Sequence, residues 1–206
     1  MKDSDIEWIG QIPAHWELKR FKDLFTERSQ KGYPEEPLLI ASQEKGVILK
    51  SDYSRNTMTV QQDFHLMKLV KKNDFVISLR SFEGGIEIAN NQGIISAAYT
   101  ILCTSNSHSV GYYKHLFKSK IFISMLITNT TGIREGRNVN YQQLKRELLP
   151  FPPPEECQKT AEYLNEKILK IDKIIETIYL EVEKLRELRK TLINDVVTGK
   201  IKVYQA

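Results

Sequence analysis

The chain has 206 residues, of which 41% are hydrophobic, and its 30 Lys and Arg outnumber its 26 Asp and Glu. These values are typical of a soluble globular protein with one ordinary domain and an appendage. No apolar run approaches the roughly 18 residues of a membrane span, and Asp3, Asp5 and Glu7 do not fit a secretory signal. Cys103 and Cys157 are far apart in the sequence, so we expect no disulfide. Two isolated cysteines without a secretory signal indicate the reducing cytoplasm. Without a membrane span, we expect no membrane partner.

The positive charge is confined to the first three quarters of the chain. Residues 1–154 hold 20 Lys and Arg against 16 Asp and Glu, whereas residues 155–206 hold 10 of each. A basic excess this small permits nucleic-acid binding without requiring it. The C-terminal part is neutral overall, which suits an element that binds protein.

The sequence pattern of the first 102 residues predicts an irregular arm followed by a β-rich region. Trp8 and Trp16 flank a glycine and a proline, and we interpret both tryptophans as packing residues that anchor the arm. Short apolar runs separated by turn residues then predict strands at 38–40, 47–49, 67–70, 75–79, 86–88, 94–95 and 97–102. Short strands with turns every eight to twelve residues indicate a strongly bent sheet or a small barrel.

Helical patterns dominate the rest of the chain. Apolar residues recur at helical spacing over 110–128, a polar loop covers 130–138, and residues 139–149 form a short amphipathic segment. Pro154 then suits the first position of a long helix, and Gly199 suits its end. About 43 helical residues make a rod of roughly 65 Å. A domain of this size is only about 35 Å across, so we expect the rod to project and to find a partner.

The long helix carries a heptad pattern of apolar residues. Ala161, Ile168, Ile175 and Val182 take the a positions and alternate with apolar residues at the d positions. Arg189 occupies the next a position, where a charge fixes register or partner choice; alternatively, Leu188 takes over the seam as the period drifts toward 3.6. The predicted dimerisation residues are Leu164, Ile168, Ile171, Ile175, Ile178, Val182, Leu185 and Leu192.

The sequence offers little support for catalysis. None of its four histidines has a His or Cys at metal-ligand spacing, so we expect no metal site. Gly84 and Gly85 lack the motif of a phosphate-binding loop, and the carboxylates are scattered. We therefore expect a chain that is not an enzyme.

Three loops carry side chains that are suited to reading DNA bases. The first is 42–45, the second is 79–82, and the third is the glycine-containing loop at 130–138. Each loop by itself fits an ordinary solvated surface, but together on one basic body they predict a surface that faces a DNA groove. The candidate DNA-binding residues are Gln43, Lys45, Arg80, Ser81, Arg134, Arg137 and Asn138.

Several segments resemble the specificity subunit of Type I restriction–modification systems. Residues 5–16 resemble the opening arm of the family, residues 79–86 and 95–99 resemble the core of its recognition domain, and residues 149–156 with the heptads and 197–201 resemble its spacer helix and terminus. The typical member has two recognition domains and two spacer helices. This chain has one of each, which is a half-length form.

The resemblance implies an α+β fold: a strongly bent β-rich target recognition domain at 1–150, followed at 151–206 by one long projecting helix that forms an antiparallel coiled coil. It implies recognition of double-stranded DNA, namely one half of a bipartite target, without catalysis by this chain. S-adenosylmethionine belongs to the partner modification (methyltransferase) subunits, and a restriction and motor subunit completes the complex. No cofactor is expected on this chain.

With one helix per chain, the simplest partner is a second copy. A twofold homodimer would read a gapped palindrome with half-sites about 34 Å apart. The rival within the family is a half-subunit that pairs with a different half-subunit and reads an asymmetric site. Two other classes stay open: a coiled-coil adaptor whose body binds protein rather than DNA, and, with least support, a standalone nuclease.

Overall fold

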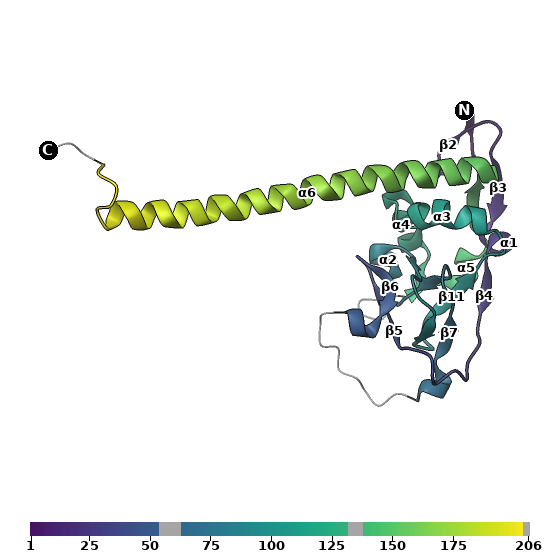
Figure 1. Ribbon diagram of the computed structural model, residues 1–206. Helices are drawn as coiled ribbons and strands as arrows, with labels where there is room; N and C mark the ends of the chain where they lie inside the picture. Colours follow the sequence, from purple (N-terminus) through teal and green to yellow (C-terminus); the bar gives the residue numbers. More distant parts are fainter. Residues whose placement is uncertain (54–62, 132–137, 204–206) are drawn as a thin grey trace. The chain divides into compact units, whose positions relative to one another are not determined.

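The computed structural model describes residues 1–53, 63–131 and 138–203 (Figure 1). The chain divides into two compact units, Met1–Ala161 and Glu162–Ala206. The predicted domain boundary after residue 150 falls inside strand β14 (Leu148–Phe151), whereas the units divide inside helix α6 (Pro154–Val197). The first two turns of α6 therefore belong with the β-rich unit, and the two units are described separately.

The first unit is β-rich, as predicted, and the strands in its described part form small antiparallel sheets. The largest has the order β4-β11-β8-β9, from Thr26–Arg28, Thr100–Cys103, Phe75–Ile77 and Glu87–Ile88. Two-stranded sheets pair β1 (Lys2–Asp3) with β2 (Gln11–Ile12), β3 (Glu17–Arg20) with β14, β5 (Leu39–Ser42) with β6 (Gly46–Leu49), β7 (Lys68–Val70) with β10 (Gly93–Ile95), and β12 (Thr130–Thr131) with β13 (Asn138–Val139).

The predicted helix at 110–128 is two helices, α3 (Val110–Leu116) and α4 (Lys120–Thr128). Ser119 lies between them in an extended conformation, accepts a hydrogen bond from the Phe122 N–H at 3.3 Å and donates one to the Leu116 carbonyl at 2.7 Å. A serine that caps one helix while it bonds to the end of another explains the break. The other short helices are α1 (Phe21–Leu24), α2 (Ser81–Gly84), α5 (Tyr141–Leu144) and 3₁₀ turns at Lys50–Asp52, Phe64–Leu66 and Ser107–Ser109.

An aromatic cluster forms the main core of the first unit. Its central members, Phe21, Phe75, Tyr113, Phe117 and Phe122, are all 0% exposed. A smaller cluster lies around β5, β6, β8 and β11. The interleaved rings tie α1, β8, α3 and α4 together, although these elements lie far apart in the sequence.

The N-terminal arm is anchored by its tryptophans, as predicted. Trp8 packs edge-on against Phe122 with ring centroids 5.8 Å apart, and Trp16 packs against Tyr112 at 5.9 Å. The Trp16 indole N–H also donates to Glu156 in the first turn of α6 at 2.8 Å. The start of α6 is therefore fixed within the first unit.

In the second unit, α6 keeps its apolar side chains exposed. Leu164 is half-buried, and the other predicted dimerisation residues are between 37% and 63% exposed. The helix ends at Val197, and Gly199 follows with φ +76°, which confirms the predicted end. Most of the stability of a helix in a protein comes from packing of its apolar face, so this exposed stripe offers a surface for a partner.

Candidate nucleic-acid interface

A polar groove of about 510 Å³ opens on the first unit between the β5–β6 hairpin and the segment that follows β8. Three of the candidate DNA-binding residues, Gln43, Lys45 and Arg80, line it. The structure thus brings together two of the three loops that the sequence singles out. The complete lining is Ala41, Ser42, Gln43, Glu44, Lys45, Tyr53, Ser78, Leu79, Arg80 and Tyr99.

A lysine that follows α3 holds the two loops together. The Lys118 ammonium donates to the Gln43 carbonyl at 3.0 Å, to the Gly84 carbonyl at 2.8 Å and to the Glu87 carboxylate at 2.5 Å. The Gln43 side-chain amide also reaches the Arg80 carbonyl at 3.5 Å. One positive charge therefore fixes the hairpin loop against α2, which sets the width of the groove.

Glu87 is the buried partner of this lysine. Its side chain is 2% exposed, and its second oxygen, Oε2, is buried without a hydrogen-bond partner in the described structure. Burial raises the pKa of the Glu87 carboxyl, and the hydrogen bond from Lys118 offsets the rise only in part. The ion pair therefore positions the loops at a cost in desolvation.

A pH-dependent gain in stability is expected for the variant Glu87→Gln. A carboxyl whose pKa is raised in the folded state contributes stability that is fully present below its unfolded pKa and is lost as the pH rises through the folded pKa. Glutamine removes this titration, so the variant should gain stability relative to the parent as the pH rises above the ordinary glutamate value of about 4.3. Urea unfolding at several pH values measures the difference, and a difference that stays constant or reverses would contradict the assignment.

Arg80 is an exposed cation of the groove. Its side chain is 74% exposed, and its Nε lies 3.0 Å from an oxygen of Glu83 one helical turn away. An exposed ion pair of this kind is weak. The guanidinium can therefore exchange Glu83 for a phosphate or a base edge at little cost.

The hairpin loop is held in position by the turn that follows β9. The Asn90 amide donates to the Lys45 carbonyl at 3.0 Å, and the Ser42 hydroxyl accepts from the Lys45 N–H at 3.3 Å. Gly46 has φ +77°, and a Cβ at this position would lie 2.8 Å from the Ile88 carbonyl. The exposed side chains of Gln43 and Lys45 thus extend from a fixed backbone.

Ser81 has a different environment from its neighbours. It is 1% exposed, and its hydroxyl accepts the Ser78 N–H at 2.9 Å. In this conformation Ser81 shapes the turn that carries Arg80 and does not face a ligand. Its contact with DNA stays a prediction, and the burial of its side chain argues against a direct contact in this conformation.

The third loop lies only partly within the described structure. Arg134 and Arg137 are outside the described residues, while Asn138 begins β13 with an exposed side chain. Strand β13 packs against α2, the helix that follows Arg80. Asn138 is therefore on an element adjacent to the second loop.

Two tyrosines and Lys118 are site residues that the loop analysis missed. Tyr53 and Tyr99 line the groove, and both are half-buried. Burial raises the pKa of the Tyr99 phenol, so the ring presents a neutral hydroxyl at physiological pH. The residues of this groove come from segments up to 58 positions apart in the sequence, and no local motif marks Lys118 as their link.

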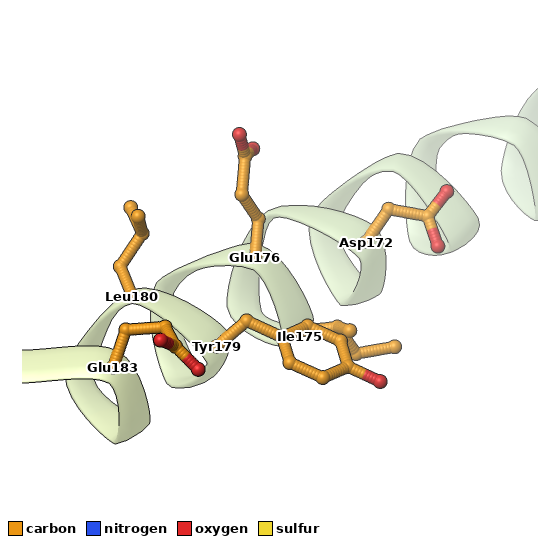
Figure 2. Close-up of a pocket in the computed structure, with 6 residues that line it drawn as sticks. All are labelled: Asp172, Ile175, Glu176, Tyr179, Leu180 and Glu183. Carbon is orange, nitrogen blue, oxygen red and sulfur yellow. The ribbon is translucent and has the colours of Figure 1, made fainter. Parts of the chain in front are cut away.

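Helix α6 of the second unit carries a shallow surface depression that is distinct from the predicted dimerisation seam and shares Ile175 with it. Figure 2 shows Ile175 and Tyr179 on one side of α6, with Glu176 and Leu180 directed to another. Together with Asp172 and Glu183 these residues outline a shallow apolar depression. The surface suits protein contacts rather than a small ligand.

Neither a metal centre nor a membrane span is found in the part of the chain that the structure describes. Among residues 1–53, 63–131 and 138–203, no three His, Cys, Asp or Glu side chains cluster as metal ligands would. Within the same ranges, no helix combines the length and apolarity that crossing a bilayer requires.

Comparison with known proteins supports the resemblance drawn from the sequence. No protein-family model matches the chain. A curated protein of Methanocaldococcus jannaschii, named as the specificity subunit of the type I restriction enzyme MjaX, is 25% identical over 206 residues, which cover 95% of this chain and 45% of that protein. The chain thus spans about half the length of the curated relative that it matches.

A solved structure with a TM-score above 0.5 shares the fold. A chain from work titled as the structural basis of complex assembly and conformational transition of the type I R-M system matches with a TM-score of 0.58 and 15% identity, over 90% of this chain and 46% of that one. The HsdS subunit from Thermoanaerobacter tengcongensis matches 80% of this chain and 40% of that subunit, with 17% identity and a TM-score of 0.49. The predicted fold class, a β-rich α+β unit followed by one long helix, is confirmed by the structure and by the first of these matches.

Proposed function

We propose that this chain is a half-length specificity subunit of a type I restriction–modification complex, which reads one half of a bipartite DNA target and positions the modification subunits. The observation that carries the proposal is the similarity along 95% of the chain to 45% of a type I specificity subunit. That coverage corresponds to one recognition unit and one long helix. The cytoplasm, where such complexes meet DNA, is the compartment that the proposal implies.

The groove on the first unit is the proposed DNA-reading surface. Arginine and lysine pair with the O6 and N7 atoms of guanine, and glutamine pairs with adenine, in the major groove. Arg80, Lys45 and Gln43 supply these three side chains from loops that Lys118 and Asn90 hold in place. The arginines of the third loop, Arg134 and Arg137, are proposed to extend the same surface.

The proposed role is recognition rather than catalysis. The groove presents the cations Lys45 and Arg80 and the amide of Gln43, which are side chains suited to base contacts. Methyl transfer from S-adenosylmethionine, and cleavage where a restriction and motor subunit is present, are assigned to partner subunits. This chain would supply their target and would need no cofactor of its own.

The long helix supplies the second half of the proposal. Its exposed heptad residues need a partner, and a second copy of the chain provides an identical apolar face. Two copies related by a twofold axis would carry two identical reading surfaces in inverted orientation. The proposed target is accordingly a gapped palindrome.

Selection from a random pool of DNA duplexes tests the proposal. The purified chain, with and without the modification subunits, should retain duplexes that share one motif, and the affinity should fall as salt is added, because phosphate contacts release counterions. Binding that is absent or insensitive to salt in both conditions would favour the protein-binding adaptor. Cleavage by the pure chain with a divalent metal would instead indicate a nuclease.

Arg80→Gln should weaken binding of the selected duplex by about 10- to 100-fold, the value of one well-placed arginine contact to a base. The substitution keeps a polar side chain of similar length, so the fold should be unaffected. Arg146→Gln is the matched control, because Arg146 is exposed but does not line the groove. Equal losses for the two variants in fluorescence anisotropy would contradict a reading role for Arg80.

A further inference from the structure

The exposed part of α6 runs from Glu162, where the second unit begins, to Val197. The family resemblance implies an antiparallel pair of such helices, and we propose that two copies of this stretch adopt it in a single register, with the twofold axis at Leu180. In that register Ile178 faces Val182 of the second copy, and Ile168 faces its Leu192. The inference rests on the dimer of the proposed function and adds which residues of the two helices meet.

Arg189 determines the orientation. Of the two alternatives for the end of the seam, we take the one in which Arg189 rather than Leu188 occupies the a position, and the Arg189 side chain is exposed. In a parallel pair in register, each a residue faces its own copy, so Arg189 would meet Arg189 inside the apolar seam, where burying two like charges is costly. In the proposed antiparallel pair, Arg189 faces Ile171 and lies next to the carboxylate of Asp172 in the second copy. The antiparallel arrangement thus removes a repulsion and gives the guanidinium a partner.

The length of the exposed stretch indicates the register. The midpoint of Glu162–Val197 lies between Tyr179 and Leu180. An axis at Leu180 therefore overlaps the two exposed stretches almost completely, and Leu164 near one end faces Val196 near the other. A shift in either direction would leave apolar residues of the seam without a partner and would lose buried area.

The flanking residues select the same register independently. With the axis at Leu180, Asp172 lies across from Arg186 of the second copy, Lys167 from Asp195, and Ile174 from Leu188, and each pair occurs twice by symmetry. Moving the axis toward the N-terminus to the next register that keeps the seam layers would place Asp172 across from Tyr179, and Lys167 across from Leu188. In that register each charged side chain would face an uncharged one instead of a charge of opposite sign.

Contacts within the single chain leave these residues available. Arg186 is paired with Glu183 at 2.5 Å, and Asp195 with Lys200 at 3.2 Å. Both side chains of the Arg186 pair are at least 65% exposed, whereas Asp195 is 25% exposed beside a Lys200 that is 65% exposed. Surface pairs like the first contribute little. Exchanging them for pairs across the dimer would cost little.

The proposed register also brings two like charges together, and this leads to a testable prediction. Glu181 would lie across from Glu181 of the second copy, next to the axis. Glu181→Gln should therefore tighten the dimer about twofold, because it removes a pair of like charges. In a parallel dimer Glu181 would instead lie near Arg186, and the same substitution would weaken association. Sedimentation equilibrium of the two proteins distinguishes these signs.

Disulfide cross-linking tests the register directly. A disulfide requires Cα atoms within about 7 Å, which only residues in the same layer of the seam satisfy. Chains carrying Ile168→Cys, mixed with chains carrying Leu192→Cys, should form a covalent dimer in high yield under mild oxidation. Each variant alone should not, since residue 168 would lie about 36 Å from residue 168 of the other copy. The parent, with half-buried Cys103 and buried Cys157, is the background control.

Three results would overturn the inference. Cross-linking of Ile168→Cys chains with one another indicates a parallel pair, and preferential cross-linking of Ile168→Cys with Leu185→Cys indicates the adjacent antiparallel register. No cross-link in any mixture, with a monomer by light scattering, rules out self-pairing. These experiments contain no DNA, so they can fail while duplex selection succeeds, and the register can hold for a protein that binds no DNA.

Discussion

The double variant Ile175→Glu/Ile178→Glu should be a monomer under conditions in which the parent chain is a dimer. Both isoleucines are exposed in the single chain, at 44% and 53%, and both belong to the seam near the proposed axis. Burying one isoleucine contributes about 1.5–3 kcal/mol, and each position occurs twice in a symmetric dimer. A rise in the dissociation constant of at least about a thousandfold, or about 4 kcal/mol, is therefore expected.

Light scattering across a concentration series measures this loss, and circular dichroism verifies that the helix persists, since glutamate is a good helix former. Leu169→Glu/Leu180→Glu is the matched control, because these leucines are 57% and 59% exposed but lie outside the heptad seam. The control should still dimerise. A parent-like dimer from the seam variant, or equal dissociation of both variants, would contradict the role of the seam.

Gly85→Ala should destabilise the first unit by about 3 kcal/mol or more, and should lower its melting temperature by about 10 °C. Gly85 follows α2 with φ +82° and ψ −173°, a conformation that is essentially restricted to glycine. A Cβ at this position would lie 2.1 Å from the Phe117 carbonyl oxygen. The backbone on both sides of this contact also carries the groove, through Lys118 and the Gly84 carbonyl, so DNA affinity should fall as well.

Gly32→Ala separates the two causes of this loss. Gly32 has a similar φ of +87°, but nothing lies within 4 Å of an added Cβ. Gly32→Ala should lower the free energy of unfolding by only about 1 kcal/mol, because alanine is strained at a positive φ but meets no clash there. Thermal unfolding measures both variants. If their melting temperatures fell by the same amount, the close approach of Gly85 to Phe117 would not be maintained in solution.

The long helix could be predicted from the sequence because its signals are local. Pro154 at the start, Gly199 after the end and the heptad spacing each act within a few residues, and the structure has α6 at Pro154–Val197. The prediction of one continuous helix over 110–128 is wrong at Ser119. The apolar spacing continues through this residue, but the Ser119 hydroxyl bonds to the end of α3 and caps the start of α4.

The candidate site could be predicted only in part. Loops rich in Gln, Lys and Arg are visible in the sequence, and two of them do line one groove. The sequence does not indicate what joins them, because Lys118 is 75 residues from Gln43 and 34 from Gly84. Nor does residue type separate Arg80, which is exposed, from the adjacent Ser81, whose hydroxyl is used inside the turn.

The methylated sequence in the DNA of cells that carry this chain and its modification subunits is the most direct test of the proposed function. Single-molecule sequencing should find methylated adenines in one gapped motif whose two halves are inverted repeats, and deletion of the chain should remove that methylation. A motif with unrelated halves would contradict the pairing of two identical reading surfaces. Methylation that is unchanged by the deletion would contradict a role in target recognition.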